Sequence, residues 1–270
     1  DTASQGVYFS KCADIFIVDN IFRDNCRTIC VAGDNTNKVI INRNHFLNSE
    51  FSAIDNYGAR MGISNNIFDS NVGAVIQIEP SVEAPYINYD SGNEEDFYGS
   101  GTENTYAVGT NIANNFINGG THGIIIHSGS YDTVISGNNI QNVTTVGIYV
   151  KLNTTRTLVL NNVIRNITLN PSSSPELPWM LTGAGICFEN CNISVNDNMI
   201  EFCHTGIYAL NPKHAMISGN SVNRCRTTPI CIYRDSKGGV IVENNYCFGS
   251  PTYEGIGTTQ YMNGGIYLSY

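Results

Sequence analysis

Residues 121–151 read THGIIIHSGSYDTVISGNNIQNVTTVGIYVK, which is one repeat unit followed by the start of the next. The alternating run GIII at 123–126 ends at HSG, and a second short run, VIS, begins at Val134. Asn138 follows this second run, and GIYV at 147–150 then restarts the cycle 24 residues after Gly123. This stretch therefore defines a repeat that can be searched for in the rest of the chain.

The same unit recurs along the chain as the pattern apolar-x-x-Asn-x-apolar. Its asparagines are Asn20, Asn44, Asn66, Asn115, Asn138, Asn162, Asn198, Asn220 and Asn244. Six of the eight gaps between them are 22 to 24 residues, and the other two, 49 and 36, equal one unit plus an insertion. Periodicity of this length indicates a solenoid.

The short runs between the asparagines are rich in Ile and Val and alternate with period two, which is typical of strands. No segment has the longer helical period with caps, and the Leu scaffold of leucine-rich repeats is missing. The sequence thus predicts an all-β fold, a right-handed single-stranded parallel β-helix of about ten coils. Successive coils would stack about 4.8 Å apart, with right-handed crossovers.

The recurring asparagine has a structural explanation. A tight bend between strands leaves backbone N–H and C=O groups without ladder partners, and burying such groups is unfavourable. An Asn amide both donates and accepts hydrogen bonds, and Asn tolerates the left-handed conformation. We therefore expect the nine asparagines to stack along the helix axis and to be structural rather than catalytic.

This pattern resembles the right-handed parallel β-helix superfamily, which includes pectate lyases, polygalacturonases and phage tailspike depolymerases. The resemblance covers nearly all 270 residues and is specific for the fold, because one solenoid supports many chemistries. It implies a carbohydrate-active protein that acts outside the cell or on a virion surface. It also implies a possible homotrimer, as in tailspike-like relatives.

Composition and organisation narrow the possible partners. We expect one domain over 1–270, a piece of a longer chain, with insertions at 79–108 and 167–182. The 14 basic and 23 acidic residues provide no basic stripe for nucleic acid, and no apolar run is long enough to insert in a membrane. The nine cysteines are spaced by coil rather than in pairs, which predicts mostly free thiols used as apolar filler.

Metal ligands are sparse in the sequence. We predict no metal site or other cofactor from recognisable motifs. The acidic part of the first insertion leaves Ca²⁺ as a possibility, through Asp90, Glu94, Glu95 and Asp96, although a plain acidic loop explains it equally well.

Strand phasing predicts a row of candidate functional residues. Alternation turns Ile124 and Ile126 inward, and Ile125 and His127 outward. The same phasing in other coils predicts a polar outer stripe on successive rungs: Asp55, Tyr57, Gln77, Glu79, His127, Tyr149, Lys151 and Glu189. Carboxylates one or two rungs apart have the spacing of glycosidase pairs. A solvated charged face is the alternative.

Roles follow from the chemistry of these side chains. The predicted acid and base are Glu79 and Asp55, with His127 and Lys151 positioning the substrate or stabilising charge. Sugar contacts are expected from Tyr57, Gln77, Tyr149, Glu189 and Trp179, the only tryptophan, which lies in the second insertion. For Trp179 the alternative is a hydrophobic clamp onto the next coil.

One local motif is similar to a more specific family. The sequence THGI at 121–124, followed one coil later by GIYVK at 147–151, is similar to the paired GHG and RIK motifs of polygalacturonases. The carboxylate motifs of that family are missing, because Gly73-Ala74 and Ser52-Ala53 stand near those places. We therefore expect His122 to be a coil-turn residue.

The predicted function is a polysaccharide depolymerase, either a glycoside hydrolase or a lyase, acting on an extracellular or capsular glycan. The alternative is a non-catalytic β-helix, either a glycan-binding adhesin or a structural stalk. The missing family motifs favour the alternative, whereas the aromatic insertions disfavour a plain stalk.

Overall fold

The computed structural model describes residues 5–10, 12–25, 27–32, 37–56, 60–79, 108–168, 183–233, 239–249 and 266–269. Over these ranges every regular element is a strand, and the strands form three parallel sheets, here named A, B and C. The short β-branched runs of the sequence account for this, because they pack well on a pleated surface.

Sheet A contains ten strands. They are β1 (Gln5–Ser10), β4 (Arg27–Ala32), β7 (Ile54–Asn56), β10 (Ala74–Ile78), β13 (His122–Ile126), β16 (Val146–Val150), β19 (Ala184–Glu189), β22 (Thr205–Leu210), β25 (Ile230–Tyr233) and β28 (Ile266–Ser269).

Sheets B and C contain nine strands each. Sheet B consists of β2 (Ala13–Val18), β5 (Asn37–Asn42), β8 (Gly62–Ser64), β11 (Asn111–Ala113), β14 (Val134–Ser136), β17 (Thr157–Leu160), β20 (Asn192–Asn196), β23 (His214–Ser218) and β26 (Val240–Glu243). Sheet C consists of β3 (Ile21–Arg23), β6 (His45–Leu47), β9 (Ile67–Asn71), β12 (Phe116–Gly119), β15 (Asn139–Gln141), β18 (Val163–Arg165), β21 (Met199–Glu201), β24 (Ser221–Cys225) and β27 (Tyr246–Gly249).

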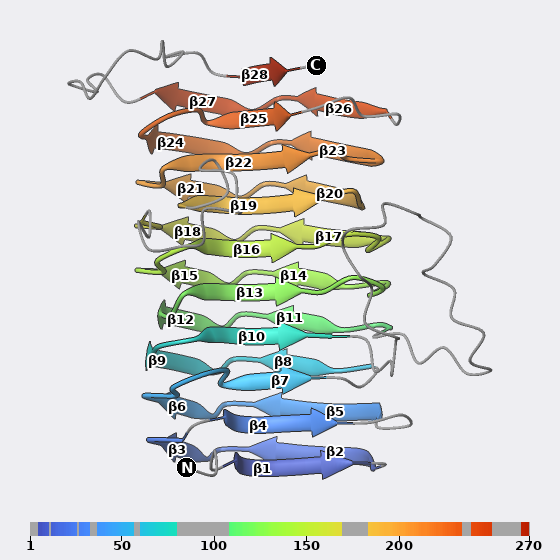
Figure 1. The fold of residues 1–270 in the computed structure, drawn as a ribbon, viewed down its shortest axis with the longest axis vertical. Coiled ribbons are helices and arrows are strands. Elements are labelled where there is room, and N and C mark those ends of the chain that lie inside the picture. Colours follow the sequence, from blue (N-terminus) through green and yellow to red (C-terminus); the bar gives the residue numbers. More distant parts are fainter. Residues whose placement is uncertain are drawn as a thin grey trace, which may run out of the picture.

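The chain visits the sheets in the order A, B, C and then repeats, so each coil has three strands. In Figure 1 the sheet A strands run left to right in front, and the others return behind them as the chain rises, which is a right-handed coil. The predicted parallel β-helix is confirmed. The described strands make nine complete coils and a tenth sheet A strand, close to the ten coils expected.

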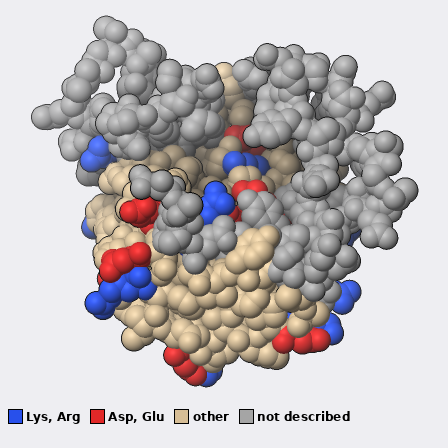
Figure 2. Space-filling view, turned by 60° about the horizontal axis from the view of Figure 1, so that its bottom comes forward, with Lys and Arg blue, Asp and Glu red and all other residues tan. Residues whose placement is uncertain are grey.

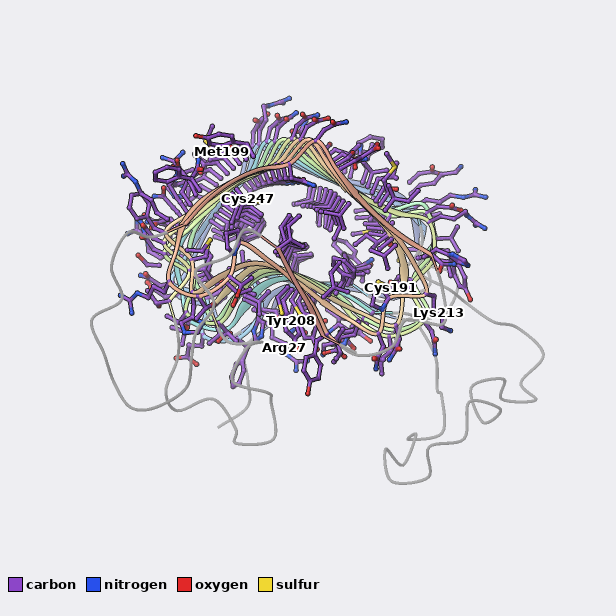
Figure 3. The ribbon with its side chains drawn as sticks, turned by 90° about the horizontal axis from the view of Figure 1, so that it is seen from above. Arg27, Cys191, Met199, Tyr208, Lys213 and Cys247 are labelled. Carbon is purple, nitrogen blue, oxygen red and sulfur yellow. The ribbon has the colours of Figure 1, made fainter. Side chains whose placement is uncertain are left out.

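Inward side chains of all three sheets form one continuous apolar core, seen down the axis in Figure 3. Each coil contributes the same inward positions, so like side chains stack on like. The rings of Phe22, Phe46 and Phe68 stack at centroid distances of 5.1 and 4.7 Å, and isoleucines continue this row in later coils. Stacking of neighbouring coils is therefore what stabilises the fold.

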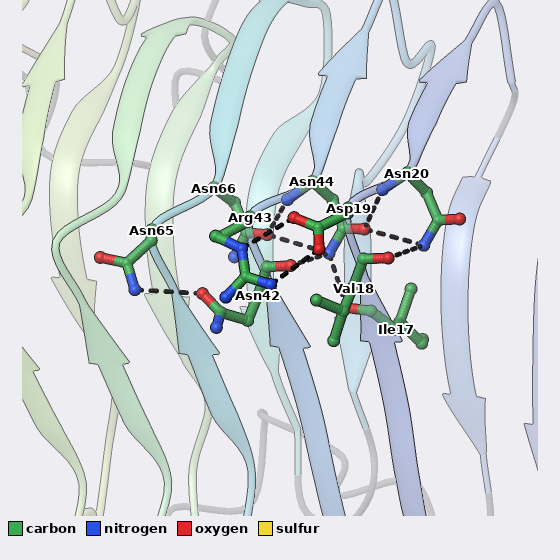
Figure 4. A network of polar contacts seen from close by, with 9 residues as sticks. All are labelled: Ile17, Val18, Asp19, Asn20, Asn42, Arg43, Asn44, Asn65 and Asn66. Carbon is green, nitrogen blue, oxygen red and sulfur yellow. Dashed lines mark hydrogen bonds and ion pairs between the residues drawn. The ribbon is translucent and has the colours of Figure 1, made fainter.

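The asparagine ladder is confirmed at the bend between sheets B and C (Figure 4). In each step the Oδ1 atom of one Asn accepts from the backbone N–H and the Nδ2 of the Asn one coil earlier, as Asn66 does from Asn44. Nδ2 also donates to a main-chain carbonyl of the earlier coil, as Asn44 does to Ile17 at 2.8 Å. The amide thus satisfies backbone groups that the bend removes from the sheets.

The last step of the predicted ladder is wrong by one residue. Asn245, not Asn244, accepts from the N–H and Nδ2 of Asn220, and Asn244 has a φ of 54° at the preceding turn position. Val242 pairs with Ile217, so the inward residue at this position is Val242 and not Ile241. Asn244 and Asn245 both follow the apolar run at 240–242, so either asparagine fits the sequence pattern.

A glycine begins the inward part of several sheet A strands, where sheet C approaches closely. A Cβ on Gly147 would lie 2.6 Å from the carbonyl oxygen of Gly185 and 2.8 Å from Cγ2 of Ile164. Gly123, Gly185 and Gly206 have equivalent contacts in their own coils. The recurring Gly-Ile of the sequence is therefore a packing requirement at this corner.

The seven cysteines with described side chains are free thiols, as expected. Cys203 and Cys225 occupy equivalent positions and pack in the core, where burial raises the pKa of the Cys225 thiol to about 12. No helix in the described ranges is long and apolar enough to cross a membrane.

The predicted insertions lie largely outside the described residues, at 80–107 and 169–182. The first leaves after β10, between sheets A and B, and the second leaves after β18, between sheets C and A. Both therefore interrupt the coil at a border of sheet A, although on opposite borders.

Candidate functional site

The predicted outer stripe lies on the outer face of sheet A. Asp55, Gln77 and Ile125 are Cα partners in adjacent strands, and Tyr149 follows in the same row. Ile124 and Ile126 are fully buried in the core, so the predicted phasing is correct. A second outer row, two residues further along each strand, carries Glu79, His127, Lys151 and Glu189.

Contacts between side chains join four of these residues. His127 Nε2 lies 3.2 Å from Glu79 Oε1 and 3.1 Å from Gln77 Oε1. On the other side of the ring, Lys151 Nζ lies 3.4 Å from His127 Nδ1. The residues come from three successive coils, and we call Gln77, Glu79, His127 and Lys151 the polar array.

Aromatic and acidic groups extend the array toward the C-terminal coils. The Tyr149 hydroxyl donates to Glu189 Oε1 at 2.5 Å, and Lys151 Nζ lies 5.5 Å from the centre of the Tyr149 ring. This distance is typical of a cation–π contact. Tyr149 and Glu189 therefore adjoin the polar array, as the predicted stripe required.

His122 also belongs to this region, contrary to our expectation of a coil-turn residue. It is the first residue of β13, and its ring stacks on that of Tyr149 with centroids 6.4 Å apart. Burial and then the charge of Lys151 lower its pKa from 6.5 to about 4. Lys151 acts on this ring from the next coil, although the two residues are 29 positions apart in sequence.

Burial is the main cause of the pKa shifts in the polar array. Burial, then Lys151 and then His122 lower the pKa of His127 from 6.5 to about 3. Burial also lowers the pKa of Lys151, while the carboxylates of Glu79 and Glu189 act in the opposite direction. Perturbed groups of this kind, gathered on one face, are typical of functional sites and also occur in structural networks.

Asp55 lies beside the polar array, but a different contact, an ion pair with Arg27, holds its side chain. Its side chain is 2% exposed and forms an ion pair with Arg27, with Nη1 and Oδ2 3.5 Å apart. The Glu79 side chain is 27% exposed. From the strand geometry, the Cα atoms of Asp55 and Glu79 are about 8 Å apart, one rung and two residues from each other.

Two predicted residues and one missed residue complete the comparison. Tyr57 and Trp179 lie outside the described residues. Ser52, which the sequence did not single out, accepts a hydrogen bond from Gln77 Nε2 at 2.5 Å. In the sequence, Ser52 is marked only by its position directly before Ala53 and Ile54, which are both buried.

The polar stripe does not extend along the whole of sheet A. Beyond Tyr149 the outer row continues as Cys187, Tyr208 and Cys231, which form a buried apolar cluster with Ile125. Figure 3 shows Tyr208 and Arg27 on the outer side of this sheet. The candidate site is therefore confined to the coils between Asp55 and Glu189.

Other faces offer less chemistry. A cavity of about 400 Å³ on the outer side of sheet B is lined mainly by Leu158, Met216, Ile241, Asn192 and His214, and its lining contains no carboxylate. Among the described residues no group of three or more His, Cys, Asp or Glu could hold a metal ion, and the acidic segment considered for Ca²⁺ lies outside them.

Surface charge is mixed in sign. In the view of Figure 2, described basic and acidic side chains lie next to each other around the rim. Ion pairs one coil apart, Arg43 with Asp19 and Arg156 with Asp132, account for part of this pattern. The face shown presents no field of one sign that would select a polyanion.

Comparisons with known proteins give one similarity. No protein-family model matches the chain, and no curated protein matches it. Among solved structures, the chain is similar to the Streptococcus pneumoniae surface protein and adhesin PfbA, at 12% identity and a TM-score of 0.46, over 90% of this chain and 69% of that chain.

Proposed function

We propose that the outer face of sheet A around the polar array binds a polysaccharide and cleaves it, as a glycoside hydrolase or a lyase. The observation that carries this proposal is the contact of Glu79, His127 and Lys151, which brings an acid, an imidazole and a cation together on one face. The resemblance of the repeat to pectate-lyase-like and tailspike proteins supports the substrate class. The same resemblance supports an extracellular or virion-surface location and a homotrimer.

Glu79 is the proposed acid–base group. It is the more exposed of the two candidate carboxylates, so a bound ligand reaches it first. Asp55 is the proposed second carboxylate, because it lies one rung and two residues from Glu79 on the same outer face of sheet A. Lys151 would stabilise negative charge that develops on the substrate, His127 would position the reacting groups, and Tyr149 would contact a sugar ring.

The test is depolymerisation of a panel of capsular and other extracellular glycans, with binding measured on the same panel. We expect Glu79→Gln to lower the cleavage rate about 100-fold or more while binding persists. Asp55→Asn should also lower the rate if Asp55 is the partner. Glu201→Gln, a half-buried carboxylate on the outer face of sheet C, is the matched control and should cleave normally.

A second candidate, a glycan-binding or structural β-helix without catalysis, is favoured by a different observation. Polar groups in and beside the array contact one another, Glu79 with His127 and Glu189 with Tyr149, as they would in a structural polar ladder. Binding without cleavage by the wild-type protein would select a glycan-binding role. Cleavage that survives Glu79→Gln would remove Glu79 from the mechanism.

A further inference from the structure

The two ring nitrogens of His127 face groups of opposite hydrogen-bonding character. Nε2 is 3.2 Å from Glu79 Oε1, and a carboxylate oxygen accepts hydrogen bonds. Nδ1 is 3.4 Å from Lys151 Nζ, and an ammonium group can only donate. The proton of a neutral ring must therefore be on Nε2, with Nδ1 as the acceptor from Lys151.

The orientation of the Gln77 amide follows from this tautomer. Because Nε2 carries the proton, Gln77 presents Oε1 to it at 3.1 Å, and the amide nitrogen points away toward Ser52 Oγ. Ser52 is 2% exposed and its side chain lies in the wall of the coil. A buried hydroxyl thus fixes the amide that faces the ring.

We infer that Lys151, His127, Gln77 and Ser52 form one hydrogen-bond relay of fixed direction, in which Gln77 is a positioning residue for the His127 ring. The donors run from Lys151 to His127, from His127 to Gln77 and Glu79, and from Gln77 to Ser52. The Nε2 proton of His127 is shared between Gln77 Oε1 and Glu79 Oε1. This sharing keeps the imidazole ring, and with it the Glu79 carboxylate, in one position.

Titratable groups from the neighbouring strands lie on this side of sheet A, and of these Lys151 and His122 lower the pKa of the ring. Asp55 lies on β7, Glu79 follows β10, His122 begins β13, and Glu189 ends β19. Tyr149 and Lys151 come from β16 and the residue after it. Burial and the nearby Lys151 charge lower the pKa of His127, which agrees with a neutral ring that accepts from an ammonium group.

The consequence for chemistry rests on the proposed function. A neutral His127 cannot supply a proton at pH 7, so it would orient Glu79 and carry the influence of Lys151 instead. The pH profile of cleavage should therefore have no histidine limb near pH 6.5. Loss of Lys151 would raise the pKa of His127, but burial, the larger cause of the shift, would still hold it below 6.5.

The experiment is long-range ¹H–¹⁵N NMR of the histidine rings in the full 270-residue chain, with His127→Gln used to assign the signal. We expect the Nε2–H tautomer of His127 from pH 9 down to pH 5. A δ tautomer, or an imidazolium at pH 7, would overturn the inference. This readout needs no substrate, so failure to find a cleaved glycan would not affect it.

Variants test each link of the relay. Lys151→Met should raise the pKa of His127 by about one unit or more, and Lys151→Gln, which keeps a donor without the charge, should raise it while preserving the tautomer. Lys213→Met is the matched control, because Lys213 donates to Asn153 at the sheet A to sheet B turn. Equal His127 titration in the Lys151 and Lys213 variants would refute the role of Lys151.

The Gln77 and Ser52 links have their own readout. Gln77→Leu and Ser52→Ala should make exchange of the His127 Nε2 proton with water about tenfold faster, as the loss of one hydrogen bond implies. Circular dichroism should confirm that each variant folds. Unchanged exchange in both folded variants would show that Gln77 does not position the ring.

Discussion

At the scale of single residues, Asn138 has the densest set of side-chain hydrogen bonds in its coil. Its Nδ2 donates to Ile112 O and Asn162 Oδ1, and its Oδ1 accepts from the backbone N–H and Nδ2 of Asn115. Asn138→Ala would leave the Asn115 N–H and the Ile112 carbonyl buried without these partners. We expect the free energy of unfolding to fall by about 2 to 5 kcal/mol, measured by urea denaturation.

Asn142→Gly is the control for this prediction. Asn142 lies at an exposed turn with a φ of 58°, a conformation that glycine adopts without strain. Its loss should change stability by less than about 1 kcal/mol. Similar losses in both variants would mean that the ladder contributes no more than any turn asparagine.

The sequence predicted this ladder because a bend amide has the same partners in every coil. The same reasoning failed at Asn244, where two neighbouring asparagines fit the local pattern and only pairing with β23 selects Asn245. His122 and Ser52 could not be placed, since their contacts depend on residues one or more coils away. Local pattern therefore determines the repeated residue but not the residues around a site.

At the scale of elements, the start of several sheet A strands is sterically closed. Gly147→Ala in β16 would place Cβ 2.6 Å from a backbone oxygen of β19 and 2.8 Å from Ile164. The strands would have to separate, so we expect the free energy of unfolding to fall by about 1 to 3 kcal/mol or more. Gly62→Ala in β8 is the control, because its nearest contact would be at 3.8 Å. An equal melting temperature for both variants would contradict this packing argument.

Period-two phasing allowed the inner and outer sides of sheet A to be assigned before any coordinates. It could not tell that the outer row changes from polar to apolar after Tyr149, because Cys187 and Tyr208 are compatible with either environment. An outward direction follows from alternation, whereas burial of that outer face depends on what packs over it.

At the scale of the whole molecule, every coil depends on its neighbours, so a local change in charge affects the stability of the stack. The pKa of His127 is lowered to about 3 and that of His122 to about 4, against 6.5 for an ordinary histidine. Between pH 6.5 and pH 4 the unfolded chain therefore binds protons that the folded chain does not. Stability must fall as the pH is lowered through this window, because protons favour the state that binds them.

Each of these histidines should contribute a slope of up to about 1.4 kcal/mol per pH unit in that window, with stability greatest above pH 6.5. Urea denaturation at half-unit steps from pH 4 to pH 8 measures this slope. The double variant His122→Gln and His127→Gln removes both groups, so its stability should vary much less with pH over the same range. Below pH 4 both proteins should also lose stability through Asp132, because the Arg156 hydrogen bond lowers the pKa of its carboxyl in the folded protein and the unfolded chain therefore binds that proton first. Parallel slopes above pH 4 in the two proteins would show that neither imidazole is held neutral by the stacked coils.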